Sequence, residues 1–197
     1  ADVLVSDPSR ASASPAMAIQ SDGTLYVVVE EQTSNYLDIY KSPDGGFMWT
    51  YEFSLLTAQD PTRPAIAIGE GLHDRLLIVY EYGRGTSSSA IHAYWEDLDG
   101  GGSAAVLIEA NPLGVANPQI CVDSPEYDYW YAYITYVRAR LVDQPDASDL
   151  RFSRTVNFGA GWTAPATLAQ DIAELDRPDI DYGGDNLYVT FTRLYAP

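Results

Sequence analysis

The chain has 197 residues, 46% of them hydrophobic, and its 28 acidic residues outnumber the 11 basic ones to give a net charge of −17 at pH 7. This composition excludes a disordered chain and supports one sizeable domain with a hydrophobic core. So acidic a surface repels phosphates, and we expect no nucleic-acid partner. No apolar run approaches the roughly 18 residues of a membrane helix, so we expect no membrane insertion either.

A Pro-x-apolar pattern recurs four times along the chain and predicts four equivalent strands. The pattern occupies residues 15–19, 64–68, 118–122 and 178–182. Proline lacks an N–H and therefore suits the first residue of a strand, so we expect each of these strands to begin at its proline. The single cysteine, Cys121, lies in the third segment and is predicted to be a small buried core residue.

Each of these segments is followed by a polar turn and then by further strands rich in β-branched and aromatic residues. Second strands are predicted at 25–29, 76–80, 130–137 and 187–191. Third strands are predicted at 36–40, 90–95 and 150–153, and fourth strands at 52–56, 105–108 and 166–169. The second strands are almost continuously apolar, which indicates that both of their faces are covered.

Four antiparallel strands in each unit of about fifty residues are typical of a β-propeller blade. The predicted fold class is therefore all-β, a propeller of four-stranded antiparallel blades with about three and a half blades in this chain. A solenoid of hairpins is the competing repeat architecture, but strands covered on both faces favour radially packed blades.

We expect one domain whose blade units span about 12–59, 60–110, 111–171 and a partial 172–197, with residues 1–7 as the outer strand of a neighbouring blade. This division leaves open sheet edges, which propellers avoid by ring closure. The chain would then be part of a longer propeller, a four-bladed ring closed by residues 3–5, or one half of a homo-oligomer joined through its open edges.

A turn with a recognisable pattern joins the third and fourth strands of the first unit, Ser42-Pro43-Asp44-Gly45-Gly46-Phe47-Met48-Trp49. An Asp carboxylate can accept backbone N–H bonds, a Gly can adopt a positive φ, and a Trp can cover the hydrophobic seam. The pattern resembles the Asp box, Ser-x-Asp-x-Gly-x-x-Trp, also called the BNR repeat, of sialidase-like propellers. In that family the box is a structural turn on the face opposite the usual active site.

A looser copy of the turn lies in the third unit, where Ser153, Asn157, Gly159 and Trp162 would take the Ser, Asp, Gly and Trp positions with two extra residues between them. The second unit has only Asp97-Leu98-Asp99-Gly100. Asp97 and Asp99 could contribute oxygen ligands to Ca²⁺, but the later ligands of a calcium loop are missing, so a polar hairpin tip is the simpler interpretation. We otherwise expect no metal and no cofactor.

The starts of the first strands and the ends of the second strands meet at one rim of the predicted propeller. This rim is rich in arginine. The ligand-binding candidates on this rim are Arg63, Glu81, Tyr82, Arg84, Arg138, Arg177 and Arg193. Arginine binds carboxylates through paired hydrogen bonds, so the rim suits an anionic ligand or a sugar. The alternative is that these side chains are solvated loop charges with ion pairs between blades.

The resemblance to sialidases implies an arginine cluster for the substrate carboxylate, an Asp as acid and a Tyr–Glu pair as nucleophile. Arg63-Pro64-Ala65-Ile66 is similar to the Arg-Ile-Pro motif of that family but lacks the Ile before Pro. No Asp takes the position of the acid, so the catalytic residues are left unassigned.

Three hypotheses on function follow. The first is an extracellular or periplasmic propeller module that binds a carbohydrate or protein partner without catalysis. The second is part of a glycoside hydrolase of the exo-sialidase kind, with the arginine-rich rim as its site. The third is a self-assembling structural repeat protein whose open blade edges pair between copies.

Overall fold

The computed structural model describes residues 4–6, 9, 11–32, 35–123, 130–140, 147–155, 157–171 and 174–194. These residues form fourteen β-strands, and none of them belongs to a helix that could cross a membrane. The strands are β1 (Ser12–Ile19), β2 (Leu25–Glu31), β3 (Tyr36–Ser42), β4 (Thr50–Leu56), β5 (Pro61–Gly69), β6 (Arg75–Tyr82), β7 (Ala90–Asp97), β8 (Ser103–Ala110), β9 (Val115–Asp123), β10 (Tyr131–Ala139), β11 (Ser148–Arg154), β12 (Ala166–Asp171), β13 (Glu174–Gly183) and β14 (Asn186–Leu194).

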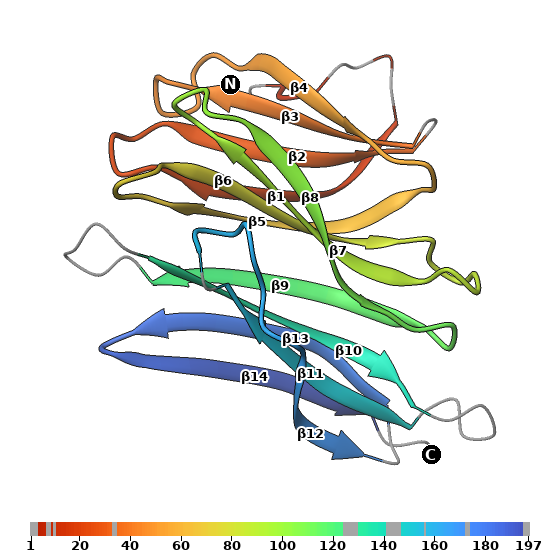
Figure 1. Ribbon diagram of the computed structural model, residues 1–197. Helices are drawn as coiled ribbons and strands as arrows, with labels where there is room; N and C mark the ends of the chain where they lie inside the picture. The colour runs from red at the N-terminus through yellow and green to blue at the C-terminus, as the bar shows by residue number, and fades with distance from the viewer. Residues whose placement is uncertain are drawn as a thin grey trace.

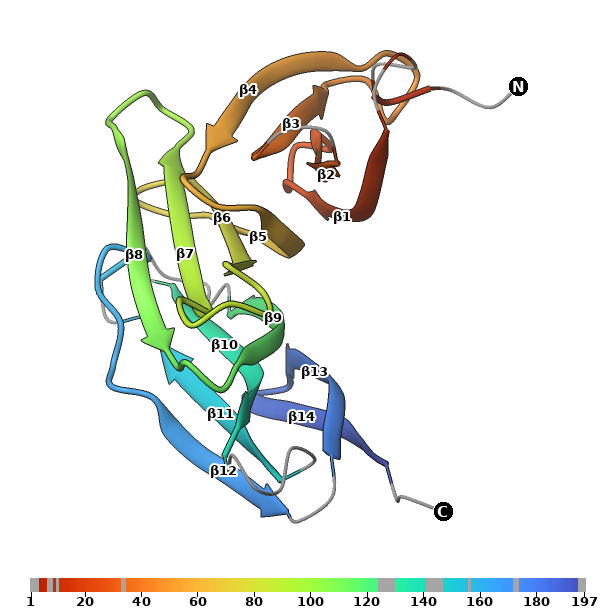
Figure 2. The same cartoon turned by 90° about the vertical axis from the view of Figure 1, so that its right-hand side faces the viewer.

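The strands form three four-stranded antiparallel sheets, β1–β4, β5–β8 and β9–β12, and a two-stranded sheet, β13–β14. Figure 1 shows the sheets one above another along the chain, and the turned view in Figure 2 shows them in an arc with β1, β5, β9 and β13 on its inner side. Each of these innermost strands contacts the next. The predicted propeller of about three and a half blades is thus confirmed, and we refer to the sheets as the first to fourth blades.

Alternating side chains of β6 explain why this strand is apolar on both faces. Leu76, Ile78 and Tyr80 belong to the hydrophobic cluster between the first and second blades. Leu77 and Val79 belong to the cluster between the second and third blades. All five are buried. Because successive side chains of a strand point to opposite faces, a strand between two blades needs apolar residues at every position.

The innermost strands each contain a β-bulge next to a proline. In every case the residue before the proline has a left-handed φ, between 46° and 55°, and the pairing with the second strand shifts there. These four residues are Ser14, Arg63, Asn117 and Arg177. The prediction that the strands begin at their prolines is therefore wrong, since β1 already begins at Ser12 and β5 at Pro61. A proline fits inside these strands because the bulge removes the need for its N–H in the ladder.

The start of the chain packs on the outer face of the first blade. Val5 contacts the cluster of Val27, Val29 and Tyr40 on that blade, and Leu4, Val5 and Ser6 belong to no strand. Among the described residues β14 pairs with β13 alone. Residues 1–3 lie outside the described part of the chain, so the outer strand expected over 1–7, the ring closed by residues 3–5 and the pairing of two copies stay predictions.

Gly69, the last residue of β5, allows the second and third blades to approach closely. A Cβ at this position would lie 2.4 Å from ring atoms of Trp130. The Trp130 side chain is buried, and its Nε1 donates a hydrogen bond to the carbonyl oxygen of His73 at 3.0 Å. The indole therefore cannot move away without losing that bond.

We expect Gly69→Ala to lower the free energy of unfolding by about 2 kcal/mol or more, the usual cost of overpacking a rigid contact. Gly183 ends β13 as Gly69 ends β5, but a Cβ there would meet no atom within 4 Å. Gly183→Ala is therefore the matched control and should change stability little. Urea denaturation followed by circular dichroism measures both, and equal effects of the two substitutions would contradict this account.

Candidate functional site

Five polar residues gather where the innermost strands bulge, and we call them the axial cluster. They are Arg63, Glu81, Arg84, Asn117 and Asp176, from the second, third and fourth blades. Two of them, Arg63 and Asn117, are bulge residues, and Asp176 directly precedes the bulge residue Arg177. The cluster thus depends on the repeated bulge, which places equivalent residues of successive blades beside one another.

Glu81 is the centre of the axial cluster and is fully buried. Its Oε1 accepts the backbone N–H of Asn117 at 2.7 Å and lies 3.4 Å from Nη1 of Arg63. Its Oε2 lies 3.5 Å from Nε of Arg84 and accepts the hydroxyl of Thr62 at 3.4 Å. Both carboxylate oxygens therefore have partners, which offsets the cost of burying the charge.

Asn117 links the third blade to its two neighbours through its side-chain amide. The amide oxygen accepts a hydrogen bond from Nη1 of Arg63, and the amide nitrogen donates to Oδ1 of Asp176 at 2.6 Å. Asp176 in turn lies 3.5 Å from Nε of Arg177, whose side chain is 84% exposed. The polar chain from Arg63 to Arg177 therefore crosses three blades.

The position of Glu81 has an equivalent in each of the first three blades. Glu30 pairs with Ala13, Glu81 with Thr62 and Val137 with Ala116, in each case the residue just before the bulge. Glu30 accepts the N–H of Arg63 at 3.3 Å, as Glu81 accepts that of Asn117. Val137 in the third blade has no carboxylate, so the repeated contact ends there.

A hollow opens at this break in the repeat, between the second, third and fourth blades, and we call it the axial hollow. Its volume is about 250 Å³. Apolar side chains of Val115, Val137 and Leu175 line it together with the polar side chains of Arg84, Asn117, Glu174 and Asp176. Apolar walls with a few convergent polar groups are the usual character of a small-molecule site.

Tyr82, Arg138 and Arg193 do not join the axial cluster, in contrast to the prediction of a single arginine-rich site. Tyr82 follows Glu81 and points to the opposite face of β6, where its ring packs on His92 with 4.9 Å between centroids. Arg193 pairs with Asp171, its Nε 2.6 Å from Oδ2. The physical reason is the alternation of side chains along a strand, which separates neighbours that look adjacent in the sequence.

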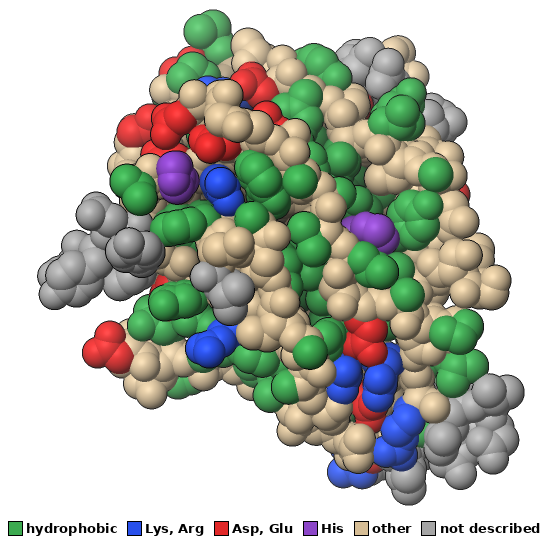
Figure 3. All heavy atoms as spheres, in the orientation of Figure 1, with side chains coloured by type: hydrophobic (Ala, Val, Ile, Leu, Met, Phe, Trp, Pro, Cys, Tyr) green, Lys and Arg blue, Asp and Glu red, His purple; other side chains and the backbone are tan. Residues whose placement is uncertain are grey.

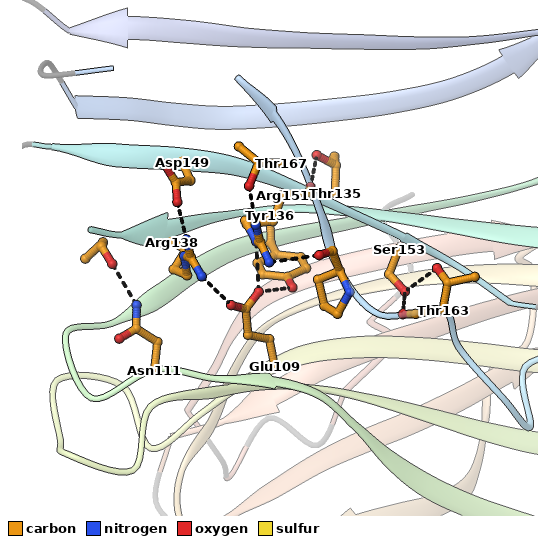
Figure 4. A network of polar contacts seen from close by, with 12 residues as sticks. Glu109, Asn111, Thr135, Tyr136, Arg138, Asp149, Arg151, Ser153, Thr163 and Thr167 are labelled. Carbon is orange, nitrogen blue, oxygen red and sulfur yellow. Dashed lines mark hydrogen bonds and ion pairs between the residues drawn. The ribbon is translucent and has the colours of Figure 1, made fainter. Parts of the chain in front are cut away.

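Arg138 belongs instead to a second polar network, shown in Figure 4, that joins the second and third blades through Glu109 of β8. Nη1 of Arg138 and Nε of Arg151 lie 3.0 and 3.1 Å from the two carboxylate oxygens of Glu109. The Tyr136 hydroxyl also donates a hydrogen bond to Oε2 of Glu109, and Nη2 of Arg138 donates one to Oδ2 of Asp149. Figure 3 shows acidic and basic side chains side by side on the surface where β10 ends in Figure 1.

The contacts in this second network shift the pKa values of Glu109 and Tyr136. Burial by itself raises the pKa of Glu109, but hydrogen bonds from Tyr136, Arg151 and Arg138 outweigh it, so the pKa of Glu109 is lowered. Burial and the bond to Glu109 raise the pKa of the Tyr136 hydroxyl. Glu109 therefore stays ionised and Tyr136 neutral, as expected for a structural ion-pair network.

The turn over residues 42–49 has the geometry expected from its sequence. Oδ1 of Asp44 accepts the N–H groups of Phe47 and Met48 at 3.0 and 2.9 Å, and the hydroxyl of Ser42 accepts the N–H of Gly46 at 2.9 Å. Nε1 of Trp49 donates to the carbonyl oxygen of Gly46 at 3.1 Å. The backbone bonds to Asp44 lower the pKa of its carboxyl.

The third blade has a turn with matching bonds, but in a different register from the one predicted. The hydroxyl of Thr155 accepts the N–H of Gly159 at 2.7 Å, and Nε1 of Trp162 donates to the carbonyl oxygen of Gly159 at 3.0 Å. Ser153 instead donates to the carbonyl oxygen of Thr163. Thr155 rather than Ser153 thus corresponds to Ser42, and the two extra residues of the predicted alignment are not needed.

Asp97 and Asp99 lie at the hairpin between β7 and β8. Oδ1 of Asp97 accepts the backbone N–H of Asp99 at 3.1 Å, which closes the tip of the hairpin. Within the described ranges no three His, Cys, Asp or Glu side chains are grouped closely enough to hold a metal ion. Cys121 is buried, which raises the pKa of its thiol to about 12 and makes it unsuited to act as a nucleophile.

Sequence reasoning missed Glu174 and Asp176 at the axial hollow and Glu109 and Arg151 in the second network. Asn117 precedes a proline of the repeat just as Arg63 and Arg177 do, which predicts it on the same rim, but it was not counted among the ligand-binding candidates. Asp176 could have been found as the neighbour of that repeat position. Glu109 could not, because its partners come from a separate blade.

We expect Glu109→Gln to lower the free energy of unfolding by about 1–3 kcal/mol at neutral pH, because charge-assisted hydrogen bonds are lost. The lowered pKa means that Glu109 stabilises the fold above its usual pKa of 4.5 and that this stabilisation is lost as the pH falls through the lower folded-state value. The stability gap between the two proteins should therefore shrink in acid. Urea denaturation at a series of pH values measures it, and a gap that does not change between pH 7 and pH 2 would rule the explanation out.

No protein-family model and no curated protein matches the sequence. Solved structures do match. They include an α-L-arabinofuranosidase, ARB93A, from Fusarium graminearum, with 16% identity over 85% of this chain and 51% of that one and a TM-score of 0.59. An α-L-arabinanase from Cellvibrio cellulosa, solved with arabinohexaose, has 10% identity over 92% of this chain and 68% of that one, with a TM-score of 0.56. A thermostable family-43 glycoside hydrolase has 12% identity over 93% and 64%, with a TM-score of 0.57.

The chain therefore spans about half the length of the Fusarium structure and about two thirds of the other two. At these identities the similarity concerns the fold. The chain has the propeller fold of these glycoside hydrolases.

Proposed function

We propose that this chain is a glycan-binding β-propeller module and that its ligand occupies the axial hollow. The observation that carries the proposal is the hollow itself, which lies where Val137 replaces the repeated carboxylate and where buried Glu81 holds Arg84 and Asn117 in place. The fold similarity to three proteins described as an arabinofuranosidase, an arabinanase and a glycoside hydrolase supports a carbohydrate ligand.

The charges around the hollow favour a neutral sugar over an anionic one. Arg63 and Arg84 both contact Glu81, and Arg177 contacts Asp176, so each arginine already faces a carboxylate of the chain. A ligand carboxylate would have to displace these partners and would also face Glu174 and Asp176. Sugar hydroxyls, in contrast, can donate to the carboxylates and accept from Arg84 and Asn117.

We further propose that the chain is a secreted, Asp-box propeller of the sialidase-like kind. Support comes from the turns at Ser42–Trp49 and Thr155–Trp162, which share the spacing of hydroxyl, Asp or Asn, Gly and Trp. In both turns the glycine N–H donates to the hydroxyl oxygen, and the tryptophan Nε1 donates to the carbonyl oxygen of the same glycine. Two copies with the same bonds are stronger support than one sequence match. Export with a cleaved signal peptide would place the module outside the cytoplasm.

A second candidate function is glycoside hydrolysis, which one observation favours. Glu174 and Asp176 both line the axial hollow, and a pair of carboxylates is the minimum chemistry for cleaving a glycosidic bond. One carboxyl would protonate the leaving oxygen, and the other carboxylate would activate water or attack the sugar carbon.

The third hypothesis, self-assembly through the open edge of β14, stays a prediction that light scattering can test.

The ligand can be tested with an array of neutral arabinan and xylan oligosaccharides and sialylated glycans, followed by calorimetry on the best binder. We expect binding to neutral glycans and a loss of about tenfold or more in affinity for Asp176→Asn, which keeps the shape but removes the charged acceptor. Asp99→Asn on the distant β7–β8 hairpin is the matched control and should bind like the unsubstituted protein. Binding to sialylated glycans alone, or to no glycan, would overturn the proposal.

The same samples separate binding from hydrolysis. Incubation with linear arabinan or xylan and measurement of new reducing ends should show none if the module only binds. Release of reducing ends that both Glu174→Gln and Asp176→Asn abolish, while Asp99→Asn does not, would instead establish the hydrolase candidate.

A further inference from the structure

A second hollow lies on the other side of the loop that carries Arg84. It has a volume of about 500 Å³, and its lining includes Asn35, Gln59, Asp60, Thr62 and Thr86. We call it the outer hollow. Amide, hydroxyl and carboxylate groups of this kind form hydrogen bonds with sugar hydroxyls, and none of these five residues carries a positive charge. The proposed function described above does not use it.

The loop Gly83–Gly85 separates the two hollows. Gly83 lines the outer hollow, Gly85 lines the axial hollow, and Arg84 lines both. Both glycines have left-handed φ angles, 62° and 73°, which turn the chain sharply on either side of Arg84. The loop is therefore a narrow ridge with one hollow on each flank.

Contacts with Thr86, Gln59 and Glu81 hold the ridge in place. The hydroxyl of Thr86 donates to the carbonyl oxygen of Gly83 at 2.7 Å, and the Thr86 N–H bonds the same oxygen at 3.1 Å. A Cβ at position 83 would lie 2.2 Å from Oε1 of Gln59 and 3.1 Å from the carbonyl oxygen of Ser88, so a glycine here lets Gln59, in the linker between the first two blades, pack against the ridge. Nε of Arg84 is anchored to the buried Glu81, while 54% of the Arg84 side chain is exposed.

We infer that the two hollows are two subsites of one ligand, a neutral oligosaccharide of at least two sugar units that crosses the ridge and shares the Arg84 guanidinium. The inference rests on the proposed function. The axial hollow is smaller than the roughly 300–1,000 Å³ of pockets that enclose a whole drug-sized ligand, and so accommodates one sugar ring. A second unit of the same chain must then leave it, and the flank with hydrogen-bonding groups on the far side of Arg84 receives that unit.

Arginine suits this shared position for a geometric reason. The guanidinium has five N–H donors in one plane, so it can donate to groups on opposite sides at the same time. Nε of Arg84 lies 3.5 Å from Oε2 of Glu81, and the residue lines both hollows. A lysine at this position would offer a single charged point and could serve one subsite at a time.

The test compares short and long sugars in calorimetric titrations of the full chain with arabinose, arabinohexaose, xylose and xylohexaose. We expect the hexaose of the preferred series to bind at least about tenfold more tightly than its monosaccharide, the effect of one further subsite. Asp60→Ala alters the outer hollow alone and should weaken hexaose binding without changing monosaccharide binding. Arg84→Ala should weaken both.

Matched controls are Arg154→Ala and Asp99→Ala, which remove exposed charges from residues that line neither hollow. Both should bind like the unsubstituted chain, and unchanged melting temperatures of all variants would show that they fold. Equal affinity for monosaccharide and hexaose, or an Asp60→Ala variant with unchanged hexaose affinity, would overturn the two-subsite inference and leave the proposed function standing. Absence of binding to all four sugars would overturn both.

Discussion

The backbone N–H of the bulged residue in each innermost strand is the constraint on which the rest of this structure depends. A bulge frees a polar group close to the axis, where water has little access, and an unpaired buried N–H is costly. Glu30 supplies the acceptor for the second blade and Glu81 the acceptor for the third. Each carboxylate therefore attaches the second strand of one blade to the innermost strand of the next.

The same constraint explains where the candidate site lies. Arg177, the bulge residue of the fourth blade, is exposed, whereas Arg63 and Asn117 are partly buried, and the third blade has Val137 in place of a carboxylate. Space that a glutamate would fill becomes the axial hollow, and the polar residues that hold the neighbouring blades become its walls. The site is thus a consequence of one break in an otherwise repeated contact.

A second repeated contact joins successive blades two residues before each bulge residue. The hydroxyl of Ser89, just before β7, accepts the N–H of Val115 at 3.1 Å, and that of Ser148 at the start of β11 accepts the N–H of Leu175 at 2.7 Å. The equivalent residue of the second blade is Pro61, which has no N–H, and Asn35 stands in the first blade where Ser89 stands in the second. The serine acceptor is therefore replaced by Asn35 in the first blade, where the next blade has Pro61 and no N–H to donate.

The sequence allowed the fold to be predicted because its signals are local. Repeated prolines, apolar second strands such as Leu76–Tyr80 and the turn at Ser42–Trp49 each act within one blade. Each strand predicted within the blade units overlaps an observed one, although the innermost strands begin three or four residues before their repeated prolines. The bulges were missed because a left-handed φ at Arg63 or Asn117 has no signature other than the proline that follows. Grouping the rim arginines failed for Arg138 and Arg193, since the face to which each side chain points depends on strand register.

The measurement that tests the central claim most directly is a two-dimensional NMR titration of the isotope-labelled chain with arabinohexaose and xylohexaose. The account predicts that the amide signals of Gly85, Gly114 and Asn117 around the axial hollow shift, together with those of Gly83 and Thr86 on the flank of the ridge. Shifts confined to the outer face of the first blade, for example at Tyr36 and Tyr51, would contradict it and would place the ligand away from the bulged strands.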